Sequence, residues 1–174
     1  MRLFIGIELS KNTKRSLENI QKELRPMMEE GRFAPKENLH LTLKFLGNCS
    51  IEDKNKIIKL LSNKYLVGPF QMEISEIGSF SNRKGRILWA GVSYNPSLLK
   101  LFTILDESLN ELSFPMEKRE YKAHITLARK IKWKEPYGLE FPPIKEQVSS
   151  IVLFESRFNG PRVYYKELNR FYLR

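Results

Sequence analysis

The alternation of apolar and polar residues predicts strands and helices in an irregular order. Alternating segments rich in β-branched and aromatic residues, typical of strands, lie at residues 2–9, 38–46, 70–77, 86–94, 121–128, 148–154 and 162–168. Apolar residues at helical spacing follow Ser10, Ser50 and Asn95, and each of these three can cap a helix N-terminus. The predicted order is βαβα-ββα-βββ.

The predicted helix after Asn95 has the clearest pattern. Pro96 suits the first helical position. Six apolar residues then recur every three or four positions, as in a buried helical face: Leu98, Leu101, Phe102, Leu105, Leu109 and Leu112. Between the other elements, Pro26 and Gly31 end the first helical region, and Lys132–Pro143, with three prolines and a glycine, is expected to form a loop.

This element order favours an α+β fold with antiparallel sheets. Strands do not alternate regularly with helices, as they would in a doubly wound parallel sheet. A length of 174 residues suits one domain or two small lobes that share an interface, and no change of composition marks a linker.

Charge and cysteine content narrow the class of protein. Thirty Lys and Arg residues against 20 Asp and Glu favour a polyanionic partner such as nucleic acid, a nucleotide or an anionic membrane, although many basic proteins have none. The single cysteine, Cys49, excludes an intramolecular disulfide and a cysteine-based zinc site. Apolar runs are short, and Glu8 interrupts the N-terminus before a signal-peptide core could form, so a soluble, cytoplasmic protein is expected.

Both histidines of the chain occur in the same local pattern, His-apolar-Thr-Leu. His40 is followed by Thr42, and His124 is followed by Thr126. The chain holds only four threonines, so two of them at the same offset from the two histidines are poorly explained by chance. Each pattern lies in a predicted strand, where residues i and i+2 share a face. The face opposite each His-Thr pair is apolar and is expected to face the core.

By the same alternation, Lys44 is expected on the face of the strand that holds His40 and Thr42. Phe45 is expected on the opposite, apolar face, toward the core. The two His-Thr pairs could then meet across one groove. Two imidazoles that face each other supply a general base and a general acid near neutral pH. Threonine hydroxyls and a nearby arginine can bind phosphoryl oxygens. These groups suit an in-line displacement at phosphorus in which a ribose oxygen leaves and no metal is needed.

Two other interpretations of the histidines are possible. A histidine in a strand is often a hydrogen-bonded structural residue, but the duplicated pattern argues against this. Two histidines with carboxylates could also bind zinc, yet the helical His-Glu-x-x-His spacing of many zinc enzymes is missing. We therefore expect no metal and no cofactor.

At these residues the sequence resembles the 2H phosphoesterase superfamily, which has two His-x-Thr/Ser motifs. It is most similar to the branch of bacterial and archaeal RNA 2′,3′-cyclic phosphodiesterases, also called 2′-5′ RNA ligases. The likeness spans nearly the whole chain, through residues 2–7, 38–47, 87–89, 124–129, 153–156 and 164–165. Ala123 stands where this branch usually has a proline before the second motif.

The resemblance implies one bilobal domain over residues 1–174, with two pseudo-symmetric antiparallel sheets, helices packed outside and a central groove. It implies hydrolysis of RNA or nucleotide 2′,3′-cyclic phosphates to 2′-phosphates, without a metal. A monomer is the default expectation, since nothing in the sequence indicates an oligomer. His40 would protonate the leaving O3′ and His124 would activate water, while Thr42 and Thr126 bind phosphate oxygens. The order of the two proton transfers stays open because the motifs look alike.

Further contacts are expected around this pair. Arg129 matches the phosphate-binding arginine that follows the second histidine in this branch, but strand alternation alone would turn it away. The strand must therefore end, twist or bulge before it. Trp89 and Tyr121 are candidates for contact with the base, and Arg86 for contact with the RNA backbone.

Two alternatives to cyclic phosphate hydrolysis remain at this point. The same groove could join RNA ends through a 2′-5′ bond or cleave such bonds. Alternatively, the chain could be a non-catalytic module that binds RNA ends, although binding alone does not require two proton-transfer groups.

Overall fold

The computed structural model describes residues 1–133 and 139–174. Three α-helices are present in this part of the chain: α1 (Lys11–Leu24), α2 (Ile51–Ser62) and α3 (Pro96–Asn110). Nine strands accompany them, namely β1 (Arg2–Glu8), β2 (Met28–Phe33), β3 (His40–Asn48), β4 (Phe70–Asn82), β5 (Gly85–Val92), β6 (His124–Trp133), β7 (Ile144–Val148), β8 (Ser150–Asn159) and β9 (Arg162–Tyr172). Two 3₁₀ turns, η1 (Arg25–Met27) and η2 (Lys36–Asn38), complete the described elements.

The helix starts form as predicted. The Ser10 hydroxyl accepts from the Thr13 N–H at 3.2 Å and begins α1. Ser50 and Asp53 form a reciprocal capping box at the start of α2, and Asn95 caps α3 with Pro96 in the first turn. Each cap satisfies backbone N–H groups that have no partner within the helix.

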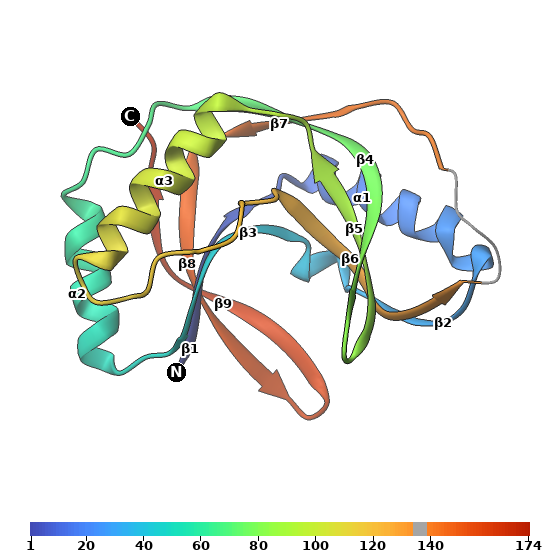
Figure 1. Ribbon diagram of the computed structural model, residues 1–174, viewed down its shortest axis with the longest axis horizontal. Coiled ribbons are helices and arrows are strands. Elements are labelled where there is room, and N and C mark those ends of the chain that lie inside the picture. The colour runs from blue at the N-terminus through green and yellow to red at the C-terminus, as the bar shows by residue number, and fades with distance from the viewer. Residues whose placement is uncertain (134–138) are drawn as a thin grey trace.

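The nine strands form one curled antiparallel sheet, which confirms the α+β expectation. Their order is β7-β4-β5-β6-β3-β1-β8-β9, with β2 paired to β6. Figure 1 shows α1 on one side of the molecule and α2 with α3 on the other. Where two separate sheets were expected, the two halves are joined between β3 and β6 through the Leu41–Ile125 bridge.

Two strands depart from the predicted pattern. β2 forms where the end of a helical region was expected, because it is an exposed edge strand whose residues show no apolar alternation. The predicted strand 148–154 is in fact two strands, since Val148 pairs with Phe70 in one half of the sheet and Ser150 pairs with Tyr172 in the other. The predicted loop also begins later, because β6 continues to Trp133; its residues 134–138 lie outside the described part.

The core lies between the sheet and its helices. Its fully buried side chains include Ile5, Leu41 and Ile125 from the centre of the sheet, with Leu101 and Leu105 from α3. A small second cluster of Phe4, Val152 and Phe154, with Tyr165 against it, lies apart from this core. Among the described residues, no helix is long and apolar enough to cross a membrane.

Candidate active site

His40 and His124 begin β3 and β6 on either side of the bridge that joins the two halves of the sheet. Leu41 and Ile125, the bridged pair, are fully buried on the core side. Continuing this register by one residue sets His40 facing Thr126 and Thr42 facing His124. All four side chains are partly buried on the other face of the sheet. The predicted facing of both His-Thr pairs is therefore confirmed, and we call this surface the groove face.

The two imidazoles are held in the same way. Nδ1 of His40 lies 2.7 Å from the carbonyl oxygen of Asn38, and Nδ1 of His124 lies 2.7 Å from that of Lys122. A carbonyl oxygen only accepts, so Nδ1 carries the proton in each ring and Nε2 is left for chemistry. Nε2 of His40 lies 2.9 Å from the Thr42 hydroxyl. Each backbone contact fixes the ring orientation and the tautomer together.

Burial lowers the pKa of both histidines. Loss of water is the largest cause for His40, and the positive charges of Lys14, Arg129 and His124 add to it against the opposing Asn38 contact, so that the pKa of His40 is lowered to about 4. The pKa of His124 is lowered by burial, with Arg129 and Lys122 adding to the effect. Arg129 and the two imidazoles therefore share one electrostatic environment. Both rings are neutral near pH 7 when the groove is empty of anions.

A matching bulge follows each histidine. Leu43 is the extra residue between the pairs Thr42–Gly6 and Lys44–Ile5. Leu127 is the extra residue between Thr126–Trp89 and Ala128–Leu88. Each bulge reverses the alternation, so the fifth residue after each histidine returns to the groove face. This confirms that β6 bulges before Arg129, which is exposed there.

The same effect corrects two expectations on β3. Phe45 is not on the core side: it is 67% exposed, and its ring centroid lies 6.1 Å from that of Phe4 on the groove face. Lys44, expected beside His40, is instead buried on the core side. There it pairs with Asp106 and donates to the carbonyl of Pro115 at 2.6 Å.

Aromatic rings surround each histidine. The rings of Phe4 and Tyr165 both have centroids 4.9 Å from that of His40, Tyr165 edge-on. Gly6 allows β1 to lie close to the backbone of β3 beside His40, because a Cβ there would lie 2.7 Å from the Leu41 carbonyl oxygen. These contacts account for the desolvation of His40. The sequence indicated that Phe4 and Tyr165 belong to family-like blocks but not that they touch the histidine.

His124 has a similar aromatic border on the other half of the sheet. Phe80 lies edge-on at 5.0 Å between centroids, and the Trp89 ring lies at 6.3 Å. Trp89 is only 4% exposed, and its indole N–H has no partner among the described residues. The Lys122 ammonium lies 4.4 Å from the centroid of a Trp89 ring, which is cation–π range. Trp89 thus packs beside the groove.

The two remaining candidates, Tyr121 and Arg86, lie in different surroundings. The Tyr121 hydroxyl donates to the Thr42 carbonyl at 2.9 Å, and its ring stacks on Phe102 at 4.1 Å between centroids. Burial raises its pKa. These contacts hold β3 in place and leave the hydroxyl occupied. Arg86 is exposed near the β4–β5 turn, opposite Ile131.

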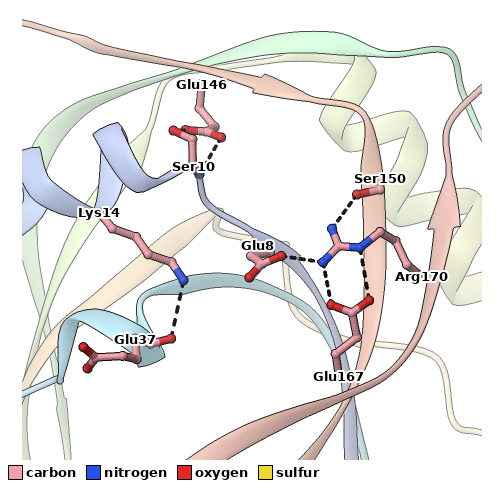
Figure 2. Close-up of polar contacts among 8 residues, drawn as sticks. All are labelled: Glu8, Ser10, Lys14, Glu37, Glu146, Ser150, Glu167 and Arg170. Carbon is pink, nitrogen blue, oxygen red and sulfur yellow. Dashed lines mark hydrogen bonds and ion pairs between the residues drawn. The ribbon is translucent and has the colours of Figure 1, made fainter.

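An ionic cluster that the sequence did not indicate lies next to His40. Glu8 is the cross-strand neighbour of His40 on β1. Arg170 of β9 binds the carboxylates of both Glu8 and Glu167 and donates to the Ser150 hydroxyl at 3.0 Å (Figure 2). The predicted strand stopped at residue 168, short of Arg170. We call Glu8, Glu167 and Arg170 the ionic cluster.

Beyond the ionic cluster lies a cavity of about 220 Å³, lined by Glu8, Arg170 and Glu146 among others. Glu146 is buried and accepts from both the backbone N–H and the hydroxyl of Ser10, as Figure 2 shows. Glu146 pairs with the core residue Met72 and therefore lies on the core side of the sheet, whereas Glu8 lies on the groove face. Among the described residues, no group of three or more His, Cys, Asp or Glu side chains could hold a metal ion.

A curled antiparallel sheet with two His-x-Thr strands side by side is the arrangement of a 2H phosphoesterase. Residues 7–89 match the family model described as LigT like Phosphoesterase. A Methanocaldococcus jannaschii protein named RNA 2′,3′-cyclic phosphodiesterase is 35% identical over 130 residues, covering 74% of this chain and 71% of the relative. An Archaeoglobus fulgidus protein of the same name is 34% identical over 137 residues, covering 78% and 76%. The chain belongs to the LigT-like phosphoesterase family.

Solved structures agree with this assignment. E. coli LigT complexed with 3′-AMP superposes with a TM-score of 0.84 at 26% identity, over 99% of this chain and 97% of that one. A Thermus thermophilus protein superposes with a TM-score of 0.81 at 28% identity, over 99% and 98%. These likenesses cover both halves of the sheet, including the second histidine motif, which lies outside residues 7–89.

Proposed function

We propose that this protein hydrolyses 2′,3′-cyclic phosphate ends of RNA to 2′-phosphate ends. The observation that carries the proposal is the paired arrangement of His40 with Thr42 and His124 with Thr126 on one groove face. In support, relatives that are 34–35% identical bear the name RNA 2′,3′-cyclic phosphodiesterase. E. coli LigT has also been captured with 3′-AMP and with phosphate.

The reaction needs one proton removed and one delivered. Nε2 of His124 takes a proton from water as the water oxygen bonds to phosphorus. The bond between phosphorus and O3′ breaks, and Nε2 of His40 gives its proton to O3′. The product is a 2′-phosphate with a free 3′-hydroxyl. The Asn38 and Lys122 carbonyls keep Nδ1–H pointed away from the groove, so Nε2 of each ring acts.

The low pKa of His40 fits this assignment. An imidazolium held in a desolvated site gives up its proton readily to a leaving alkoxide. A bound phosphate anion opposes the neighbouring positive charges and raises the pKa of both rings, so that one can carry the proton during turnover. The exchange of roles between the two rings stays open.

Phosphate binding falls to Thr42, Thr126 and Arg129. The two threonines lie diagonally across the joint of the sheet, each facing the histidine of the other motif. The Thr126 hydroxyl can donate to one phosphoryl oxygen, and the Thr42 hydroxyl can do so once protonation of Nε2 of His40 releases it. Arg129 reaches the same face because of the bulge at Leu127, and its charge acts on both histidines. A guanidinium binds phosphate oxygens more strongly than a neutral donor does.

The exposed ring of Phe45 is available for the terminal base. It stands at the position on β3 that Arg129 occupies on β6, five residues after the histidine. We assign base contact to Phe45 in preference to Tyr121, whose hydroxyl is occupied, and to Trp89, which is buried beside His124. Arg86 stays a candidate for the RNA backbone. The protein acts without a metal, as a monomer, and as a single bilobal domain in the cytoplasm.

The proposal is tested by substituting each histidine. His40→Ala and His124→Ala should each lower turnover of an RNA with a 2′,3′-cyclic phosphate end by about 10²–10⁴-fold. Thr42→Val and Thr126→Val should weaken activity, whereas Thr103→Val on the exposed side of α3 serves as a matched control. Activity should persist in EDTA. Full activity in either histidine variant would contradict the proposal.

Product analysis separates the remaining alternatives. The wild-type protein is incubated with the cyclic-phosphate RNA alone, and in parallel with a 5′-hydroxyl RNA. A monoester on O2′ supports hydrolysis, and a joined product with a 2′-5′ bond supports ligation. Tight binding without turnover at any pH would indicate an RNA-end-binding module instead.

A further inference from the structure

The groove face extends well beyond the reacting groups along β1, β8 and β9. Register pairs Arg2 with Ser156 and Ser156 with Tyr165, whose ring contacts His40. Arg2 and Phe4 share this face by alternation along β1. A continuous surface therefore leads from His40 past Tyr165 toward the end of the β8–β9 hairpin.

Phe158 lies on this surface near the hairpin end. It follows Ser156 by two residues on β8 and pairs with Val163, so it shares the groove face with Tyr165. Phe158 is 67% exposed. Figure 1 shows the β8–β9 hairpin projecting from the body of the sheet, away from the helices. An aromatic ring in this position adds nothing to the core.

The hairpin is fixed relative to the reacting groups. The Asn38 side-chain amide donates to the Val163 carbonyl at 2.9 Å. The carbonyl of the same Asn38 orients His40. A ligand on Phe158 would therefore lie on a surface that is tied to the catalytic ring through one residue.

Charge differs between the two ends of the groove face. Toward the hairpin, Arg2 and Arg129 both lie near enough to Tyr165 to lower the pKa of its phenol against the larger effect of burial, which raises it. In the other direction, Glu8 and Glu167 share the single guanidinium of Arg170. A polyanion is therefore attracted more strongly to the first end than to the second.

We propose that Phe158 and Arg2 form a subsite for single-stranded RNA upstream of its cyclic phosphate end. A base stacks on Phe158, and Arg2 contacts the adjoining phosphate. Aromatic rings interleaved with basic side chains are the usual means of binding single strands without sequence preference. Phe158 lies four residue steps beyond Phe154 on β8, about 13 Å at 3.3 Å per residue, so this subsite takes a nucleotide beyond the terminal one.

This inference rests on the proposed function and specifies its substrate class as an oligonucleotide strand. The surface suits RNA better than a second copy of the chain. Its charge is positive beside the exposed ring, and a chain with a net charge of +10 would repel its own copy there.

The test compares two substrates on the same variants. Phe158→Ala should lower kcat/KM for a short single-stranded RNA with a 2′,3′-cyclic phosphate end by about 5- to 100-fold. It should leave kcat/KM for 2′,3′-cyclic AMP, which has no upstream nucleotide, within about twofold. Tyr164→Ala is the matched control, because Tyr164 is an exposed aromatic on the opposite face of the same hairpin. It should change neither substrate.

Arg2→Gln gives an independent readout. A lost phosphate contact reduces the slope of log kcat/KM for the oligonucleotide against log salt by about 0.7. Arg162→Gln, on the outer face of the hairpin, should leave the slope unchanged. The change of slope would report the lost phosphate contact even if the Arg2→Gln variant were less stable than the wild-type protein.

Each outcome has a clear meaning. An equal loss on both substrates, or none on the oligonucleotide, would overturn the subsite. A shift from dimer to monomer in Phe158→Ala would identify the ring as a contact between copies and would also overturn it. Failure of the wild-type protein on both substrates would instead reject the proposed function.

Discussion

At the scale of single residues, short-range contacts set the tautomer of each of the two histidines. The carbonyl two residues before each histidine fixes its tautomer, and this arrangement is repeated in both halves of the sheet. The duplicated His-x-Thr pattern made the pair itself predictable from sequence. The ionic cluster was not predictable, because Glu8, Glu167 and Arg170 are separated by up to 162 residues and meet only through the sheet register.

Arg170 governs where the Glu8 carboxylate points. Glu8 neighbours His40 across β1 and β3, but its carboxylate is held by Arg170. In Arg170→Met the freed carboxylate can approach His40 and stabilise the imidazolium, which raises the pKa of His40. In the pH profile of kcat/KM, the limb that reports protonation of His40 should move to higher pH. This is measured as a pH–rate profile on a cyclic-phosphate substrate.

A second substitution isolates that cause. The double variant Arg170→Met with Glu8→Gln lacks the carboxylate and should return the limb to its original pH. Urea unfolding of both variants controls for the loss of the ionic cluster. An unchanged profile in a folded Arg170→Met variant would show that the cluster has a structural role only.

At the scale of secondary-structure elements, the bulges in β3 and β6 determine which side chains lie on the groove face. Regular alternation predicted the His-Thr facing correctly and then misplaced Lys44 and Phe45, because a bulge inserts one residue and reverses every later side chain. Only the functional requirement placed on Arg129 indicated that a bulge was needed. The edge strand β2 escaped prediction because exposed strands carry no apolar period.

The reversal at Leu43 also creates a buried ion pair. Lys44 pairs with Asp106 of α3, and the other carboxylate oxygen of Asp106 accepts from the Glu117 N–H at 2.9 Å. Lys44→Met leaves the carboxylate buried without its cation and should lower the free energy of unfolding by about 3–5 kcal/mol. Urea denaturation measures this loss.

The matched control removes the charge of both partners of the ion pair. In Lys44→Met with Asp106→Asn, the amide oxygen still accepts from Glu117, and no buried charge is left unpaired. This double variant should be more stable than Lys44→Met alone. If both unfold at the same urea concentration, the pair does not couple β3 to α3.

The groove depends on how the two halves of the sheet meet at the scale of the whole molecule. The chain crosses from one half to the other at Ser149, between β7 and β8. Local pattern predicts the strands but cannot show this crossing, since only Ser149 separates the end of β7 from the start of β8 and no turn residue marks the change. The joining of both halves at Leu41–Ile125 brings the two motifs to one face.

Since Arg129 acts on both rings and the charge of His124 acts on His40, the two rings titrate as a pair, and the pH profile of the reaction reports both of them together. Hydrolysis requires one ring protonated and the other neutral, so kcat/KM should follow a bell. Its acid limb, where both rings are protonated, should lie near the His40 pKa of about 4. Its alkaline limb, where both are neutral, should lie below the ordinary histidine pKa of about 6.5. The bound phosphate raises both values, so the kcat bell should lie at higher pH than the kcat/KM bell. Steady-state rates at constant ionic strength check this, and a kcat/KM that stays level from pH 4 to 8 would contradict paired acid–base catalysis.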